Sequence, residues 1–463
     1  MEKILIIDFG GKYNFNLAQK VREQRVYCEF KTEIVHESIG EYKGVILADG
    51  DGGYTDEQKR TAQAVLKMGV PVLGIGYGAR LLAKLLGGET EASTLGFGNF
   101  NLAVDVSCTM FSNVTAHTVC TGDCAEIISR LPLGFRISAK IEGCPNAAIE
   151  NAKKHIYALQ FFPQLRGTTE GEKILFNFLF KICGCKEEWT MPSFVGKTIN
   201  RLETELADKT AVCVISGSVV SLAAAVLLHR VIGDRLTCVF VNNGLLREGE
   251  AEMTVELFRK RYDIDVCYED ISESVKQALQ GKTDSAEKTK LVKDMTEDAV
   301  KRTVGQLPSV DYNIVEDCFG RESEGLVCNV VAEGKRLAPF GTLTFDEIVL
   351  VANELGLAEE LTALKPLPVE GVVNAVGGEF SFEKLALAKK LEALLRGEIT
   401  AANVDGLLCD FGVVVNDGCA IISASVRTDS GMVWAKLPYG ILANVSERII
   451  AETEIKEVYY KIF

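Results

Sequence analysis

The sequence has little that would mark a metalloprotein, a secreted protein or a membrane protein. Its four histidines include none paired with cysteine at the spacing of zinc ligands, so we expect no metal site. The N-terminus lacks the long apolar stretch and the cleavage site of a secretory signal. The 14 cysteines, spread over the whole chain, are therefore expected to be reduced thiols in the cytoplasm.

Basic residues are also in deficit, with 50 Lys and Arg against 64 Asp and Glu, for a net charge of −14. Such a chain repels polyanions, so we expect no general nucleic-acid binding. The longest uncharged run, residues 211–228, reaches the threshold length of a membrane span. Its serines and Gly217 predict instead a buried strand, a tight loop and the start of a helix, so we expect no membrane partner.

A chain of 463 residues has room for about three domains. Short apolar runs alternate with helical patterns over residues 4–86, and again over 211–261. This alternation predicts parallel sheets with helices on both faces. A helical pattern at 382–396, followed by strand-like runs, predicts a third region. The predicted fold class is α/β, with two successive doubly wound parallel-sheet domains followed by a smaller α+β domain.

Ligands of such sheets bind at the carboxyl ends of the strands. The turns at 8–11, 48–53 and 74–78 are therefore candidate sites in the first domain. Residues 183–192 form a mixed stretch that is predicted to link the first two domains.

Several runs, in order along nearly the whole chain, resemble glutamine-hydrolysing GMP synthases. The resemblance is densest over residues 212–252. The matching runs are Ile6-Ile7-Asp8-Phe9-Gly10, Pro71-Val72-Leu73-Gly74-Ile75, Ile182-Cys183-Gly184-Cys185, Trp189-Thr190-Met191, residues 234–241, Asn243-Gly244-Leu245-Leu246-Arg247 and Trp434-Ala435-Lys436-Leu437-Pro438-Tyr439.

The resemblance implies three domains: a class I glutamine amidotransferase domain at 1–187, an ATP-pyrophosphatase domain at 192–368 and a dimerisation domain at 369–463. The family converts XMP to GMP, using ATP with magnesium to adenylate the purine and ammonia drawn from glutamine. It also implies a homodimer.

The catalytic residues of the amidotransferase family are replaced in this chain. The family motif G-I-C-Y-G reads Gly74-Ile75-Gly76-Tyr77-Gly78 here, so Gly76 stands at the position of the nucleophilic cysteine. The family motif Q-F-H-P-E reads Gln160-Phe161-Phe162-Pro163-Gln164, so Phe162 replaces the histidine base and Gln164 its orienting glutamate. Loss of the nucleophile alone costs several powers of ten in rate.

Two alternatives stay open at this site. Another thiol, Cys120 or Cys124, could act as nucleophile, or the remnant could bind a different small molecule beside Phe161 and Phe162. The family loop S-G-G-P has also become Ala48-Asp49-Gly50-Asp51, and two carboxylates there disfavour the stabilisation of an oxyanion.

The ATP loop of the family, S-G-G-V-D-S, is degenerate here. Val220 replaces the aspartate that organises the metal-bound phosphates, and Ser218 replaces a glycine, at a cost of about 1 kcal/mol if that position has a positive φ. We favour a retained strand–loop–helix turn, and the alternative is weak binding of ATP or another anion at the helix N-terminus. The loop consists of Ser216, Gly217, Ser218, Val219, Val220 and Ser221.

Other family segments are changed as well. The S-H-H-N loop has its nearest match at Cys328-Asn329-Val330, the P-F-P-G-P-G turn has become residues 366–371, and the tail that holds the XMP phosphate is missing after Tyr459. The leading hypothesis is a pseudoenzyme that acts as a scaffold, a regulator or a nucleotide sensor, as a homodimer or in a mixed dimer with an active synthase. The alternative is an ATP-dependent ligase that uses free ammonia or acts on an altered substrate, and that holds magnesium through Glu248 or Asp234.

Overall fold

A computed structural model describes residues 2–33, 41–308, 310–319, 334–362, 371–428 and 431–462. The chain divides into two compact units, Met1–Ser193 and Phe194–Phe463. The domain limits at 187 and 192 stay predictions. The limit at 368/369, the segment 328–330 and residues 366–370 lie outside the described residues.

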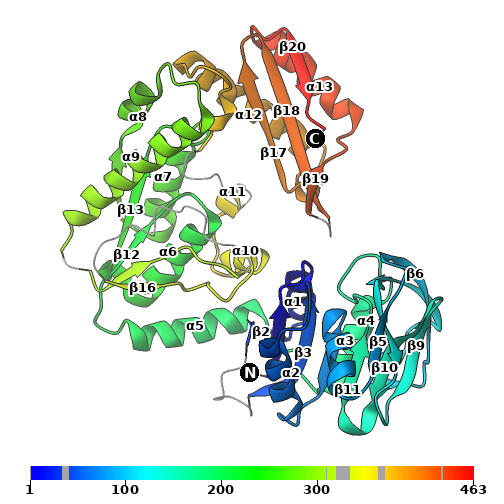
Figure 1. Ribbon diagram of the computed structural model, residues 1–463. Coiled ribbons are helices and arrows are strands. Elements are labelled where there is room, and N and C mark those ends of the chain that lie inside the picture. Colours follow the sequence, from blue (N-terminus) through cyan, green and yellow to red (C-terminus); the bar gives the residue numbers. More distant parts are fainter. Residues whose placement is uncertain are drawn as a thin grey trace. The chain divides into compact units, whose positions relative to one another are not determined.

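The first unit is built on one large mixed sheet (Figure 1). Among the described residues it has nine strands in the order β2-β1-β3-β4-β11-β10-β9-β6-β7. Neighbours from β2 to β11 are parallel, and neighbours from β11 to β7 are antiparallel. The strands are β1 (Lys3–Phe9), β2 (Tyr27–Lys31), β3 (Tyr42–Gly50), β4 (Val72–Ile75), β6 (Phe97–Val104), β7 (His117–Asp123), β9 (Arg136–Ile141), β10 (Cys144–Asn151) and β11 (Ile156–Leu159).

The parallel half is the predicted doubly wound part. Its strands are apolar on both faces because helices cover both. The antiparallel half was not predicted, because its connections are too short to hold a helix and so leave no alternating pattern of strands and helices.

The remaining elements of the first unit are helices, one further strand pair and short helical turns. They are α1 (Asn14–Glu23), α2 (Asp56–Leu66), α3 (Tyr77–Leu85), α4 (Gly171–Phe176), the paired β5 (Glu89–Ala92) and β8 (Glu126–Arg130), and the turns η1 (Thr109–Phe111), η2 (Ala152–Lys154) and η3 (Asn177–Ile182).

Helix α3 is fixed by the apolar core of the first unit. Leu81 and Tyr77 of α3 pack in one cluster with Ile7 of β1, Leu47 of β3 and Val65 of α2. Helix α2 begins with a capping box between Thr55 and Gln58, which satisfies two backbone N–H groups. Packing of Tyr77 and Leu81 against β1, β3 and α2 therefore fixes the position of α3, and with it that of the turn after β4.

The stretch predicted as a linker packs on the first unit over most of its length. Cys183, Cys185 and Trp189 are buried, and the Trp189 ring lies 4.6 Å from the ring of Tyr27. The first unit ends at Ser193. Helix α5 (Met191–Glu205) then leads into the second unit.

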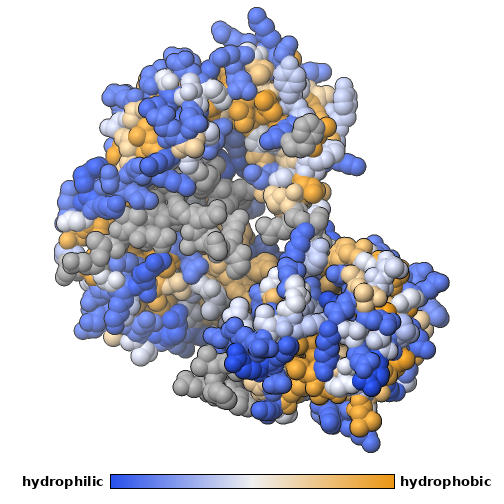
Figure 2. Space-filling view, in the orientation of Figure 1, coloured by the Kyte–Doolittle hydropathy of each residue, from blue (hydrophilic) through white to orange (hydrophobic). Residues whose placement is uncertain are grey.

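The second unit contains a sheet that is parallel throughout. Its order within the described residues is β14-β13-β12-β15-β16. Hydrophilic side chains cover α9 in the space-filling view (Figure 2). The strands are β12 (Ala211–Val214), β13 (Leu236–Asn242), β14 (Val266–Asp270), β15 (Tyr312–Ile314) and β16 (Lys335–Leu337). The helices are α6 (Val219–Ile232), η4 (Gly233–Arg235), α7 (Glu250–Tyr262), α8 (Ser272–Leu279), α9 (Ser285–Gly305), α10 (Phe345–Glu354) and α11 (Glu359–Thr362).

The uncharged run 211–228 forms β12, a loop and the buried part of α6, as predicted. In the part of the chain that the structure describes, no helix is long and apolar enough to cross a membrane.

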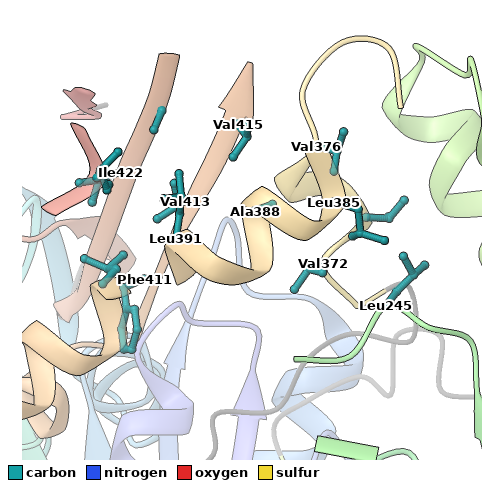
Figure 3. Packing of buried hydrophobic residues seen from close by; sticks show 14 of the residues in the cluster. Leu245, Val372, Val376, Leu385, Ala388, Leu391, Phe411, Val413, Val415 and Ile422 are labelled. Carbon is teal, nitrogen blue, oxygen red and sulfur yellow. The ribbon is translucent and has the colours of Figure 1, made fainter. Parts of the chain in front are cut away.

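The C-terminal part of the second unit is a smaller sheet packed against helices. β18 (Cys419–Thr428) pairs with β17 (Asp410–Asn416), β19 (Gly431–Trp434) and β20 (Glu457–Tyr460). Helices α12 (Phe382–Ala401) and α13 (Tyr439–Glu452) pack against it, and short turns lie at η6 (Val373–Ala375) and η7 (Asp405–Leu407). Figure 3 shows Val413 of β17 beside Leu391 of α12, and the same buried cluster contains Val415, Leu245 and Val372. The predicted fold class is confirmed.

Candidate functional site

The first candidate site is the turn between β4 and α3, where Gly76 stands between strand and helix. Its φ of +56° lies in the left-handed region, which glycine adopts without steric cost. The Gly76 N–H donates to the carbonyl oxygen of Leu159 (2.8 Å), which ties the turn to β11. The strand-to-helix turn implied by the resemblance is therefore present, on a residue without a side chain.

The space beside Gly76 is filled by two other side chains. A Cβ atom at this position would lie 2.5 Å from Oδ1 of Asp49 and 2.8 Å from Cε1 of Phe162. Real Cβ atoms essentially never approach a neighbour within 3.0 Å. The turn has no room for a nucleophilic side chain unless Asp49 and Phe162 move.

The Asp49 carboxylate lies on the backbone donor at the start of α3. The Tyr77 N–H donates to Oδ1 of Asp49 (2.8 Å). An N–H group in this position is the kind of donor that stabilises an oxyanion in acyl transfer. Asn14 fixes the Asp49 backbone on both sides, since its Oδ1 accepts from the Asp49 N–H (3.0 Å) and its Nδ2 donates to the Asp49 carbonyl (2.7 Å). The donor is therefore occupied by a carboxylate from the same chain.

Phe162 belongs to an aromatic cluster. Its ring centroid lies 5.8 Å from that of Tyr13 and 6.4 Å from that of Phe97, and Phe162 is 1% exposed. Phe161 is fully buried as well. These contacts are those of core packing, and a side chain without a proton to exchange stands where the family has its base.

Gln164 is buried, and neither atom of its amide group has a hydrogen-bond partner within the described residues. Gln160, in contrast, cross-links three strands, because its Oε1 accepts from the Ile128 N–H (2.9 Å) and its Nε2 donates to the Asn146 carbonyl (2.8 Å). The retained glutamine of this motif therefore has a structural role. The structure brings Gly76 and Phe162 together and leaves Gln164 without a partner.

The thiols considered as substitute nucleophiles are inaccessible. Cys120 and Cys124 are both fully buried. Burial raises the pKa of the Cys120 thiol to about 12, so Cys120 does not form the reactive thiolate at neutral pH. A hydrogen bond with Cys144 lowers the pKa of the Cys124 thiol, so for Cys124 the obstacle is its burial.

The second candidate site is the loop between β12 and α6. Gly217 has a φ of +86°, and Ser218 has a φ of −73°. The strain considered for Ser218 is absent, because Ser218 is the N-cap of α6 and its Oγ accepts from the Ser221 N–H (3.2 Å). Val219 and Val220 are buried. Because Val220 stands where the family motif has aspartate, the loop has no carboxylate at that position.

The hydroxyl groups of this loop are hydrogen-bonded to a buried carboxylate. The Ser216 Oγ donates to Oε1 of Glu316 and the Ser218 Oγ donates to Oε2, both at 2.6 Å. Glu316 is 7% exposed and follows β15, the parallel neighbour of β12. Its carboxylate lies at the N-terminus of α6, where a phosphate would be favoured by the helix dipole.

Sequence reasoning missed Glu316. The signal was an acidic residue two positions after the short strand β15, and its role becomes visible only because β15 pairs with β12. Asp49 was noted in the sequence, but its contact with Gly76 was not foreseen.

Residues named for magnesium do not gather at this loop. Asp234 precedes β13, whereas the loop follows the parallel strand β12, so the sheet places Asp234 at the opposite edge. Glu248 lies beyond the carboxyl end of β13. Among the residues that the structure describes, no three His, Cys, Asp or Glu side chains form a group that could hold a metal ion.

The Asp49 carboxyl predicts a pH-dependent stability. Burial raises its pKa, while the Tyr77 N–H and Arg80 act in the opposite direction. As the pH rises above the ordinary range of an aspartate, the unfolded chain loses this proton before the folded chain does, so stability falls. We expect Asp49→Asn to have a higher Tm than the wild type at pH 7. The difference in Tm should become smaller towards pH 4, because the Asp49 carboxyl is then increasingly protonated.

Thermal unfolding across this pH range checks the prediction. Asp51→Asn, at an exposed carboxylate in the same loop, is the matched control and should leave the Tm unchanged. An Asp49→Asn variant less stable than the wild type at pH 7 would contradict the assignment.

Comparison with known proteins gives the family. Residues 5–182 match the family model of class-I glutamine amidotransferases. A glutamine-hydrolysing GMP synthase of Ruminiclostridium cellulolyticum is 33% identical over 100% of this chain and 97% of its own length, and one of Acetivibrio thermocellus is 32% identical with the same coverage. Among solved structures, a glutamine amidotransferase of Thermotoga maritima covers 44% of this chain and 86% of its own, with 18% identity and a TM-score of 0.32. The chain belongs to the family of glutamine-hydrolysing GMP synthases.

Proposed function

We propose that this member of the family neither hydrolyses glutamine nor aminates XMP, and that it acts by binding, as a scaffold or regulator in the cytoplasm. The observation that carries the proposal is the filled turn at Gly76. Asp49 and Phe162 occupy the volume of the missing nucleophile, and Asp49 occupies the N–H of Tyr77. The proposed loss of glutamine hydrolysis therefore rests on the packing of Asp49 and Phe162 around the turn as well as on the replaced nucleophile.

The loop at Ser216 supports the same proposal for the ATP-dependent step. An approaching phosphate would have to displace the carboxylate of Glu316 from two serine hydroxyls. It would also meet the negative charge of that carboxylate at close range. Nucleotide sensing through this loop is disfavoured on the same ground.

A turnover assay tests the proposed function. With glutamine, or with XMP, ATP, magnesium and glutamine, we expect glutamate and GMP formation to be at least about 10⁴-fold slower than for the Ruminiclostridium cellulolyticum relative measured in parallel. Ammonium in place of glutamine should not restore GMP formation. Release of AMP and pyrophosphate with ammonium would instead support the ammonia-dependent ligase.

Removing the internal carboxylate tests the account of the ATP loop. In Glu316→Ala the hydroxyls of Ser216 and Ser218 lose their carboxylate acceptor, so we expect Mg-ATP to raise the Tm of this variant and not that of the wild type. A ligand at 100 times its Kd adds about 2.7 kcal/mol of stability. The double variant with Ser216→Ala is the control and should lose much of the gain. Stabilisation of the wild type by Mg-ATP would contradict the account.

A self-association surface is proposed on the C-terminal sheet. β19 and β20 pair with the same side of β18 and carry exposed apolar side chains, and apolar side chains are visible over this sheet in Figure 2. Exposed strands of this kind pair readily with another chain. The exposed apolar residues are Met432, Val433 and Trp434 of β19, Tyr459 of β20, Tyr439 at the start of α13, and Ile462 after β20. We propose a homodimer through this surface, and a mixed dimer with an active synthase as the route to regulation.

Light scattering checks the dimer. We expect about twice the monomer mass of 50.5 kDa for the wild type and the monomer mass for Trp434→Glu. For the mixed dimer, co-expression with a tagged active synthase should recover both chains. Recovery of this protein alone would count against it.

A further inference from the structure

A cavity of about 360 Å³ opens at the carboxyl ends of β13 and β14, and neither candidate site described above contributes to it. One wall is the turn 244–249 together with the start of α7. The facing walls are the first turns of α8 and one side of α12. Carboxyl ends of parallel strands are where α/β sheets bind their ligands, and the volume lies in the range of small-molecule sites.

The walls of this cavity are fixed by packing beneath it. Leu245 is fully buried in the cluster that contains Val372 and Leu385, and Figure 3 shows these three side chains together. Gly244 has a φ of +78°, and a Cβ there would lie 2.7 Å from Cβ of Ser272 and 3.2 Å from Cε of Lys276. A residue without a side chain is therefore needed for the Lys276 stem to lie across the turn.

One side of the cavity carries two lysines. The Lys389 ammonium donates to the carbonyl oxygen of Gly244 (2.8 Å). Burial and, after it, the charge of Lys276 lower the pKa of Lys389, while Glu248, Glu250 and Glu252 act in the opposite direction. In the described part of the chain, neither lysine forms an ion pair with a carboxylate. A carboxylate or another anionic group between them would relieve this repulsion.

The cavity is also lined by three exposed carboxylates, Glu248, Glu252 and Asp270. Burial acts to raise the pKa of the Asp270 carboxyl, but the hydrogen bonds of Ser272 and Tyr268 and the charge of Lys276, which lies within electrostatic reach, lower it overall. Within the described residues, no ion pair is formed by Glu248 or Glu252. Arg247 does not neutralise them, because its guanidinium is paired with Glu250 (3.4 Å) and Glu392 (3.3 Å). The cavity is thus lined by charged groups of both signs that lie within electrostatic reach of one another.

From this arrangement we propose that the cavity binds a small zwitterion of the free α-amino acid class. Its carboxylate lies between Lys276 and Lys389, and its ammonium group lies against Glu248 and Glu252. A simple anion would be repelled by the two glutamates, and a simple cation by the two lysines. The cavity uses no residue of the turn at Gly76 or of the loop at Ser216, so the proposal stands or falls independently of the proposed function.

Isothermal titration of the full-length protein tests the proposal. The probes are the standard L-α-amino acids, with acetate, methylammonium and inorganic phosphate as references at the same concentrations. We expect at least one amino acid to bind saturably and none of the three references to do so. Binding of acetate or phosphate as tight as that of any amino acid would overturn the proposal, and so would the absence of binding by every amino acid.

Variants place the ligand in the cavity. Lys276→Gln and Glu252→Gln should each raise the Kd at least about tenfold, because each removes a charged partner of the ligand. Lys260→Gln is the matched control, since Lys260 is an exposed lysine of α7 that pairs with Glu256 outside the cavity. A Kd that changes with Lys276→Gln and not with Glu252→Gln would indicate an anion site and overturn the zwitterion. Unfolding curves with the wild-type Tm verify that both variants are folded.

Discussion

Two helix N-termini in this structure lie against a carboxylate of the same chain, and at Asp49 the attraction to the helix is opposed by the cost of burying the charge. The Tyr77 N–H at the start of α3 binds the Asp49 carboxylate, and the N-cap region of α6 binds that of Glu316 through two serines. Both helices follow a parallel strand, so both termini lie where α/β proteins place anionic groups of their ligands. An internal carboxylate at each terminus competes with any external one.

The two carboxylates differ in how they are held. The Asp49 backbone is fixed by two hydrogen bonds with Asn14. Its carboxylate lies beside Gly76 and accepts from the Tyr77 N–H. Glu316 is bound by side-chain hydroxyls and lies in the interior, next to the strand that precedes the loop. Asp49 fills the space beside Gly76 and occupies the N–H of Tyr77, whereas Glu316 occupies the hydroxyls of Ser216 and Ser218. In each unit a carboxylate thus lies at the start of a helix that follows a parallel strand.

Much of this was predictable from sequence. Alternating apolar runs located the parallel strands and their helices, and family motifs located Gly76, Phe162 and the loop at Ser216. The antiparallel half of the first sheet left no periodic signal that distinguishes it. The contact of Glu316 with Ser216 joins residues 100 positions apart, so it depends on which strands are neighbours. No pattern in the sequence indicates that the amide of Gln164 lacks a hydrogen-bond partner within the described residues.

The positive φ of Gly76 has a consequence for any attempt to place a side chain at this turn. The backbone has the strand-to-helix shape that the resemblance implies, but Asp49 and Phe162 occupy the space that a Cβ atom would need. A Gly76→Cys substitution alone would bring its Cβ atom closer than 3.0 Å to both side chains, so both would have to shift. It would also place a side chain at a positive φ, so the turn opposes the substitution through its backbone as well as through its neighbours.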